Sequence, residues 1–370
     1  MKQGWEYKKW NEVLTIINGK NQSAVEDANG EFPIYGSGGI MGYANNWLCP
    51  EKCVIIGRKG NINKPIFVKT KFWNVDTAFG LNANIEYLIP KFLFYFCLDY
   101  NFERHNKAVT IPSLTKADLL KITIPLPPKS TQLAIVSELD KINELIRLKK
   151  EQLKDFDNLA QSIFYEMFGD PVENEMGWEV KKLGEVCNIT SSKRIFADEY
   201  TDKGIPFYRS KEVIERSKGL PISVELFISP ERYSEIREKF GIPVVGDILI
   251  TAVGTIGKIW SIDTNEKFYF KDGNLVWLKD IDTSLINTIF FRRLLEYLID
   301  EYKKINANGA AYSALTIAKL KLMQCPLPPL PLQHLFAQRI EQIEHQKAEV
   351  QKAITDLETL LASRMQYWFE

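Results

Sequence analysis

The sequence contains one segment twice, about half a chain apart. Residues 4–20 align without gaps on residues 177–193, and nine of the seventeen aligned positions are identical. Solenoid proteins repeat every few tens of residues, so an offset of 173 residues is too long for one of their units. The duplication therefore predicts two complete domains in tandem, each built on the same plan.

The repeat continues beyond its opening, but its offset grows along the chain. It rises from 173 to 194 and then to 201 residues at three further pairs of segments: 33–37 with 206–210, 60–64 with 254–258, and 125–128 with 326–329. The second copy thus holds about 21 extra residues before Ile248 and seven more before Leu315. Insertions collect in loops on a retained scaffold. We therefore expect the ends of each copy to be scaffold and the middles to differ.

Each copy ends in a long segment with the pattern of a coiled-coil helix. Mostly apolar residues recur there at alternating steps of three and four, as a heptad repeat requires. The first helix is expected over about 130–168, before the stop signal at 169–171. The seam positions are Ile135, Leu139, Ile142, Ile146, Lys149, Leu153, Phe156, Ala160, Ile163 and Met167, and then Phe336, Ile340, Ile343, Lys347, Val350, Ile354, Leu357, Leu361, Arg364 and Trp368.

The apolar seam of each helix requires a partner. A helix of about 38 residues is roughly 57 Å long. We expect the two helices to pack on each other antiparallel, because one short connection then leaves a globular part, here called a head, at each end. Two alternatives stay open: each helix folds back on its own domain, or pairs with another chain.

These patterns predict an α+β chain. It should contain two α/β globular heads in tandem, separated and joined by two long antiparallel coiled-coil helices in a pseudo-twofold arrangement. The predicted divisions are 1–121 for the first head, 122–176 for a central region with its helix, 177–322 for the second head, and 323–370 for a distal region with its helix. Predicted strands are Val54–Gly57 and Ile248–Thr251, and predicted buried helices lie within Tyr87–Tyr100 and Ile289–Leu298.

The cysteines argue against a disulfide framework and against a zinc site. They stand at positions 49, 53, 97, 187 and 325, an odd number without regular spacing. Cys49 and Cys53 have no second Cys/His pair nearby to complete a tetrahedral zinc site. The sequence opens directly on the repeated motif, and its most apolar stretch is shorter than a membrane span. We therefore expect a cytoplasmic protein with reduced thiols and no membrane partner.

The net charge of zero conceals an uneven distribution. Residues 1–121 hold 15 Lys and Arg against 11 Asp and Glu, and residues 177–322 hold 22 against 20. The regions 122–176 and 323–370 hold 6 against 10 and 4 against 6. Both heads are weakly positive and both helical regions are acidic, which favours a polyanion that touches the heads alone.

Two corresponding loops carry side chains that suit a nucleic acid. Each follows a predicted strand and contains a G-x-I-x-K run, Gly60–Lys64 in the first head and Gly254–Lys258 in the second. Glycines let the backbone approach a ligand, and Arg, Lys, Asn and Thr donate hydrogen bonds to phosphates and base edges. A charged loop without a ligand is the alternative, but its occurrence in both heads favours a shared contact. The candidates are Arg58, Lys59, Asn61, Asn63 and Lys64, with Thr251, Thr255 and Lys258.

Two further segments in each head are candidates for the same contact. One precedes the proline-rich run and contributes His105 and Lys107 in the first head, and Asn306, Asn308 and Tyr312 in the second. The other contributes Lys193, Arg194, Tyr208, Arg209 and Lys211 in the second head, where the first head offers Gly36-Ser37-Gly38-Gly39. Corresponding loops carry different side chains, as two readers of unlike sequences need. For each single residue a purely structural role remains open.

Catalytic motifs are missing from the sequence. Its three histidines, at positions 105, 334 and 345, form no pair with metal or triad spacing. It contains no G-x-S-x-G, no P-loop and no dinucleotide-type glycine turn, and no amino-methyltransferase or nuclease motif. A binding protein fits better than an enzyme, and an enzyme with unrecognised motifs is the rival.

With these features the chain resembles the specificity subunit of type I restriction–modification systems. The resemblance rests on the duplicated openings, the strand–glycine–lysine loops, the two heptad helices, and the paired entries Pro125–Pro128 with Gln132 and Pro326–Pro329 with Gln333. It covers essentially all 370 residues. The combination in this order is specific, although no single motif is.

The resemblance implies a DNA-binding role without catalysis. Each head would be a target-recognition domain that reads one half of a split, asymmetric site in double-stranded DNA, and the helices would set the spacer. Two methyltransferase subunits, which bind S-adenosylmethionine, would dock on the helical regions, and restriction motor-nuclease subunits would complete the complex. The chain itself would bind no cofactor or metal. The alternative is that the chain is the recognition subunit of a related restriction system, in which methylation and cleavage are on one partner chain.

Overall fold

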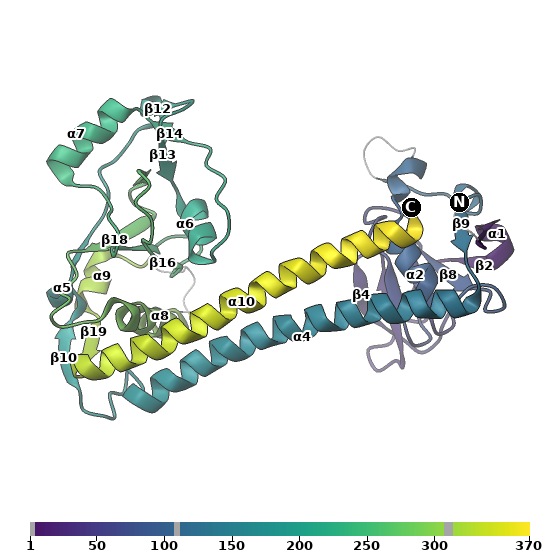
Figure 1. Cartoon of the computed structure of the whole chain (residues 1–370), viewed down its shortest axis with the longest axis horizontal. Helices are drawn as coiled ribbons and strands as arrows, with labels where there is room; N and C mark the ends of the chain where they lie inside the picture. Colours follow the sequence, from purple (N-terminus) through teal and green to yellow (C-terminus); the bar gives the residue numbers. More distant parts are fainter. Residues whose placement is uncertain (1–3, 107–111, 307–313) are drawn as a thin grey trace. The chain divides into compact units, whose positions relative to one another are not determined.

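The computed structural model describes residues 4–106, 112–306 and 314–370. The chain divides into two compact units (Figure 1). The first comprises the residues up to Leu153 together with Glu349–Glu370, and the second comprises Lys154–Ala348. Each unit therefore contains one head and a part of both long helices.

Among its described residues, the first head contains three small sheets. A two-stranded sheet has the order β1-β9, a four-stranded sheet β2-β8-β5-β6, and a three-stranded sheet β4-β3-β7. The strands are β1 (Glu6–Lys9), β2 (Leu14–Asn18), β3 (Phe32–Gly36), β4 (Gly39–Ala44), β5 (Cys53–Gly57), β6 (Ile66–Val68), β7 (Trp73–Asn74), β8 (Ala78–Ala83) and β9 (Thr123–Leu126). The helices are α1 (Trp10–Val13), α2 (Pro90–Asp99), the short 3₁₀ helix η1 (Phe102–His105), α3 (Lys116–Leu119) and α4 (Lys129–Phe168).

The second head repeats this plan, with sheets β10-β19, β11-β18-β15-β16 and β12-β14-β13-β17. Its strands are β10 (Glu179–Lys182), β11 (Asn188–Thr190), β12 (Tyr200–Thr201), β13 (Ile205–Tyr208), β14 (Phe227–Ile228), β15 (Ile248–Thr251), β16 (Ile259–Ser261), β17 (Tyr269–Phe270), β18 (Leu275–Lys279) and β19 (Gln324–Leu327). Its helices are α5 (Leu183–Val186), η2 (Ala197–Glu199), α6 (Ser210–Ser217), α7 (Pro230–Phe240), α8 (Thr288–Asn306), α9 (Ile317–Leu322) and α10 (Leu330–Phe369). The extra residues predicted before Ile248 form α6, β14 and α7.

The predicted strands and buried helices are confirmed. Strands β5 and β15 cover the two segments expected to be extended, and every residue of both is buried. Helix α2 lies within the apolar stretch Tyr87–Tyr100, and α8 covers its expected counterpart. Both helices contribute to the main hydrophobic core of their own head.

The two ends of each head meet in a strand pair. Strand β1 pairs antiparallel with β9, so that Tyr7 faces Pro125, and β10 pairs with β19, so that Val180 faces Pro326. The register is the same in both heads. The duplicated opening of each copy is therefore joined to the proline-rich run that precedes its long helix, which explains why the two motifs recur together.

The predicted heptad seams are confirmed in both long helices. Helices α4 and α10 each span 40 residues. All twenty predicted seam positions are buried or half-buried. Within the first unit Lys150 of α4 binds Glu358 of α10 at 2.7 Å, and within the second unit Asp157 binds Lys347 at 2.8 Å. A second contact in each unit, Glu138 with Arg364 in the first and Met167 with Arg339 in the second, shows that the partner numbers fall along α10 as they rise along α4. The helices therefore run antiparallel within each unit (Figure 1).

The polar residues in the α10 seam have partners on α4. Lys347 binds Asp157 in the second unit. In the first unit Arg364 donates two hydrogen bonds to the Glu138 carboxylate, and Trp368 donates a third at 3.1 Å. The Trp368 ring also stacks on Trp5, with centroids 6.2 Å apart. The end of α10 is thereby fixed to the first head.

One buried glutamine fastens the start of each long helix. Gln132 Oε1 accepts a hydrogen bond from Ile89 N at 2.9 Å. Its Nε2 group donates to the carbonyls of Tyr87 and Pro127, both at 2.9 Å. Gln333 forms the same three bonds in the second unit, with Asn287 N, Leu285 O and Pro328 O at 2.8, 3.1 and 2.7 Å. Each amide satisfies the backbone in front of a buried helix while it holds α4 or α10 in place.

Two further observations concern the sequence predictions for membranes and metals. No helix among the described residues is long and apolar enough to cross a membrane. In the same residues no cluster of three or more His, Cys, Asp and Glu side chains could hold a metal ion. All five cysteines are buried as free thiols.

Replacing Gln333 with alanine should destabilise the second unit by about 1–3 kcal/mol, because it leaves backbone groups of Asn287 and Leu285 without partners. The urea midpoint of the purified chain measures the change. Gln342→Ala removes an exposed glutamine from the same helix and should leave the midpoint unchanged. Equal midpoints for the two variants would contradict the role given to Gln333.

Replacing Glu138 with glutamine should make the first unit less sensitive to acid. Hydrogen bonds from Arg364 hold the pKa of Glu138 below its ordinary value of 4.5. The ionised carboxylate therefore stabilises the fold above about pH 4.5, and this contribution is lost as the pH falls through the lowered value. For a pair about one-third exposed, we expect about 0.5–1 kcal/mol.

Urea midpoints at neutral and acidic pH test this expectation. The wild-type chain should lose more stability on acidification than Glu138→Gln does. Glu349→Gln, which changes an exposed carboxylate on α10 of the same unit, is the control and should follow the wild type. Identical acid dependence of wild type and Glu138→Gln would exclude the proposed role of this ion pair.

Candidate nucleic-acid interface

The basic loop of the first head follows β5 and is held by its backbone. Arg58 N donates to Thr77 O at 2.8 Å, and Arg58 O accepts from Leu114 N at 2.9 Å. Gly60 N donates to Pro112 O at 3.1 Å, and Gly60 has a φ of 76°, which favours glycine. With the backbone fastened, the side chains of Arg58, Lys59, Asn61 and Lys64 are exposed. They remain candidates for DNA contact.

Asn63 lies in the same loop but has a structural partner. Its Oδ1 accepts from Phe102 N at 2.8 Å, and its Nδ2 donates to Asn101 at 3.2 Å. These bonds bring η1 and the candidate His105 beside the loop. The His105 ring bonds to the Tyr100 hydroxyl at 2.7 Å and stacks on that ring. Lys107 lies outside the described residues.

The tip of the β3–β4 hairpin also reaches this loop. A Cβ atom built on Gly38 would lie 3.8 Å from Asn61 Nδ2. Beyond the tip, Ile40 and Met41 are exposed. The first head thus brings together the three predicted segments, although they lie far apart in sequence.

The corresponding loop of the second head is closed by Thr251. This side chain is fully buried, donates to Thr255 O and accepts from Lys258 N at 2.9 Å. Thr251 was a candidate for DNA contact, and its burial corrects this prediction, because the side chain stabilises the loop by hydrogen bonds within it. Thr255 and Lys258 are exposed and remain candidates.

Tyr208 is a second correction. Its side chain is 1% exposed, and its ring stacks on Phe268 with centroids 4.6 Å apart. A side chain with so little exposed surface has no face for DNA in this structure. Tyr208 belongs to a hydrophobic core of the second head.

Arg209 and Lys211 are exposed or half-buried, but carboxylates neutralise them. Arg209 binds the buried Glu212 at 3.1 Å and Glu225 at 2.9 Å, and Lys211 binds Glu225 at 2.6 Å. These two cations lower the pKa of Glu225 to about 2, so the carboxylate is ionised at neutral pH. Arg209 and Lys211 remain predicted DNA contacts, although the carboxylates of Glu212 and Glu225 already balance their charges.

The remaining candidates of the second head lie on or near one surface. Lys193 and Arg194 are exposed, and Arg194 binds Asp272 at 2.7 Å. Asn306 is half-buried at the end of α8, where its Nδ2 donates to Tyr302 O at 2.6 Å. Asn308 and Tyr312 fall outside the ranges that the structure describes.

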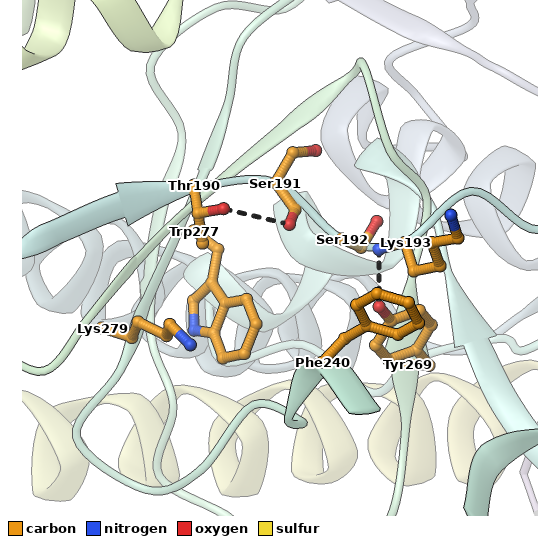
Figure 2. Close-up of a pocket in the computed structure, with 8 residues that line it drawn as sticks. All are labelled: Thr190, Ser191, Ser192, Lys193, Phe240, Tyr269, Trp277 and Lys279. Atoms are coloured by element: carbon orange, nitrogen blue, oxygen red, sulfur yellow. Dashed lines mark hydrogen bonds between the residues drawn. The ribbon is translucent and has the colours of Figure 1, made fainter. Parts of the chain in front are cut away.

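Two adjoining pockets join the candidate segments of the second head. The larger, of about 350 Å³, is lined by Ser191–Ser192, by Ala252–Val253 of the loop and by Ala314–Ile317, among others. The smaller, of about 200 Å³, is lined by Thr190–Lys193, Phe240, Tyr269, Trp277 and Lys279 (Figure 2). Sequence reasoning missed Phe240, Trp277 and Lys279, because they match no repeated motif and join the candidates only through the fold.

The candidate surfaces carry hydroxyls, amides and cations, which suit contacts to phosphates and base edges. They also carry carboxylates, among them Asp272 in the larger pocket. The thiols are poor nucleophiles, because burial raises the pKa of Cys53, Cys187 and Cys325 to about 12 in each case.

Comparison with known proteins identifies one family. A family model described as the type I restriction modification DNA specificity domain matches residues 2–155 and again residues 175–359. A putative type I restriction enzyme specificity subunit of Haemophilus influenzae, S.HindORF215P, is 29% identical over 354 residues, which cover 92% of this chain and 87% of that protein. The EcoDI specificity subunit of Escherichia coli is 19% identical and covers 95% and 84% of the two chains.

Solved structures show the same fold. The S subunit of a type I restriction–modification system from M. genitalium aligns with a TM-score of 0.58 and 17% identity over 100% of this chain and 98% of that one. A chain from a study of complex assembly and conformational transition of the type I R-M system aligns with a TM-score of 0.64 and 20% identity, over 99% and 97%. Since the family model covers most of the sequence in two copies, this chain belongs to the type I restriction modification DNA specificity domain family.

Proposed function

We propose that this chain is the DNA sequence-recognition subunit of a type I restriction–modification complex, and that it has no catalytic activity of its own. Each head reads one half of a bipartite, asymmetric site in double-stranded DNA. The long helices set the spacer between the halves. Methylation and cleavage belong to partner subunits.

One observation carries the proposal. Both heads bring corresponding loops together on the same arrangement of strands, yet the side chains on those loops differ. The first head presents Arg58, Lys59 and Lys64 after its central strand, where the second presents Thr255 and Lys258. A common scaffold with unlike loops suits the reading of two unlike half-sites, since base edges are distinguished by the side chains that reach them.

The helical regions suit the docking of partner subunits. Outside the seam, both helices expose large apolar side chains, which on soluble proteins mark interaction surfaces when they gather. They include Leu145, Leu148 and Leu360 in the first unit, and Leu159 and Leu335 in the second. We infer that each helical region binds one methyltransferase subunit, which carries S-adenosylmethionine, and that restriction motor-nuclease subunits join this complex.

Rival functions have less support. One rival is a recognition subunit whose partner chain carries both methyltransferase and nuclease. The relatives described above do not favour it, because they are described as specificity subunits of type I systems. An enzyme with unrecognised motifs would act alone. Incubating the purified chain and DNA with S-adenosylmethionine or with Mg²⁺ tests that rival, and methylation or cleavage by the chain alone would overturn our proposal.

Replacing Arg58 and Lys64 with glutamine should weaken DNA binding by the complex of this chain with its methyltransferase subunits. A lost bidentate arginine contact costs about 1–3 kcal/mol, and a lost phosphate contact lowers the salt slope of binding by about 1. Equilibrium binding at several salt concentrations measures both effects. Lys52→Gln is the matched control, since Lys52 precedes β5, at the opposite end of the strand from the loop. Binding that Arg58→Gln and Lys64→Gln leave unchanged would remove this loop from the interface.

Inserting one heptad into both helices should change the spacer and leave the half-sites intact. Seven residues keep the seam in phase, and the places for insertion are where the two units divide, after Leu153 in α4 and after Ala348 in α10. Methylome sequencing of cells that carry each version reads out the site. An unchanged spacer would refute the role of the helices, and altered half-sites would refute the assignment of recognition to the heads.

A further inference from the structure

The smaller pocket of the second head has a composition that the sequence did not suggest. It lies where the end of β11 and the following segment meet the end of α7 and the strands β17 and β18 (Figure 2). Two lysines, three hydroxyl residues and three aromatic residues line it: Lys193, Lys279, Thr190, Ser191, Ser192, Phe240, Tyr269 and Trp277. No carboxylate is among these lining residues. The pocket therefore favours an anion.

The two lysines of this pocket lie over aromatic rings. Lys193 Nζ lies 5.1 Å from the centroid of the Phe240 ring, and Lys279 Nζ lies 4.7 Å from that of Trp277. Within the part of the chain that the structure describes, neither forms a salt bridge, although Lys279 is attracted by the carboxyl group of Asp247, which accepts a hydrogen bond from Trp277 Nε1 at 2.8 Å. The nearby arginines differ, since Arg194 binds Asp272. The aromatic rings position the ammonium groups without neutralising them.

A hydroxyl group in the pocket also lacks a partner. The Oγ atom of Ser192 is buried and has no hydrogen-bond partner among the described residues. Buried polar atoms nearly always have a partner, so each exception needs an explanation. A ligand oxygen that accepts a hydrogen bond from Ser192 would supply one.

The size of the pocket decides between a phosphate and a base. Its volume of about 200 Å³ is below the roughly 300–1,000 Å³ of sites that hold drug-sized molecules. Stacking of a base requires an open ring face, but Tyr269 is fully buried and Trp277 is 2% exposed. The third ring, Phe240, is 48% exposed, but Lys193 Nζ already lies over it, 5.1 Å from its centroid. A small anion fits these limits better than a nucleobase does.

We propose that this pocket binds one backbone phosphate of the DNA, with Lys193 and Lys279 as its cations and Ser192 as a hydrogen-bond donor. Phosphate contacts fix the register of a protein on the duplex, while base contacts specify the sequence. Ser191 and Ser192 also line the larger pocket beside the recognition loop, so a phosphate held here would set the distance of that loop from the bases. The inference rests on the proposed function, since it assigns a contact within the same interface.

Salt dependence of DNA binding is the first test. Lys193→Gln and Lys279→Gln should each weaken binding by the methyltransferase complex and lower the slope of log K against log salt by about 0.9 or less. The preferred sequence should not change. Lys203→Gln, at an exposed position in the same head, is the matched control. Ser192→Ala should weaken binding without a change in slope. Urea midpoints equal to the wild type establish that the variants are folded.

A scan with single neutral phosphates is the second test. Methylphosphonate replaces one phosphate at a time along the second half-site, and one position should weaken binding by the wild type but have no effect on Lys279→Gln. If no such position exists, or if Lys279→Gln changes the preferred sequence, the inference is wrong. Thermal stabilisation by inorganic phosphate that is lost in Lys279→Gln, with DNA binding unchanged, would assign the pocket to a free anion and also overturn it. Failure of the wild-type complex to bind any specific sequence would instead refute the proposed function.

Discussion

The antiparallel strand pair at the base of each head is the constraint on which the rest of the structure depends. Pairing of β1 with β9, and of β10 with β19, joins the first residues of a head to the run from which a long helix begins. The buried amides of Gln132 and Gln333 then bind backbone groups on both sides of that junction. A head therefore cannot shift against the start of its helix without breaking hydrogen bonds in a buried setting, where each unsatisfied group costs free energy.

Beyond this junction, specific contacts also hold the two long helices together within each unit. The seam is apolar in most positions, so the hydrophobic effect holds the pair together. The polar interruptions of the α10 seam lie where a carboxylate on α4 receives a cation from α10, as with Asp157 and Lys347, whereas Lys149 in the α4 seam bonds Gln152 of its own helix. Such pairs add little free energy when partly exposed, but they specify the antiparallel register, since a shifted pairing would bury a charge without a partner.

In the heads, by contrast, corresponding loops differ from each other. The strands that precede the two loops, β5 and β15, are fully buried and closely alike, whereas the loops differ in length, charge and bonding. In the second head several cations of the candidate segments are already neutralised, as Arg209 and Lys211 are by Glu225. Lys193 and Lys279 form no salt bridge among the described residues, and both line one pocket. The number of basic residues in a segment therefore does not indicate where a phosphate binds. The ion pairs that these residues form determine which of their charges are available to a phosphate.

Sequence patterns alone predicted the duplication, the heptad seams, the strands before the glycine loops, and the recurrence in each copy of an opening motif and of a proline-rich run followed by glutamine. These features repeat or are periodic, so local pattern suffices to find them. The fold was needed to show that Tyr208 and Thr251 are buried, that Asn63 fastens η1 to the first loop, and that Lys279 and Lys193 line the same pocket. Burial, ion pairing and pocket formation depend on residues far apart in the chain, and no periodicity records which of them will meet.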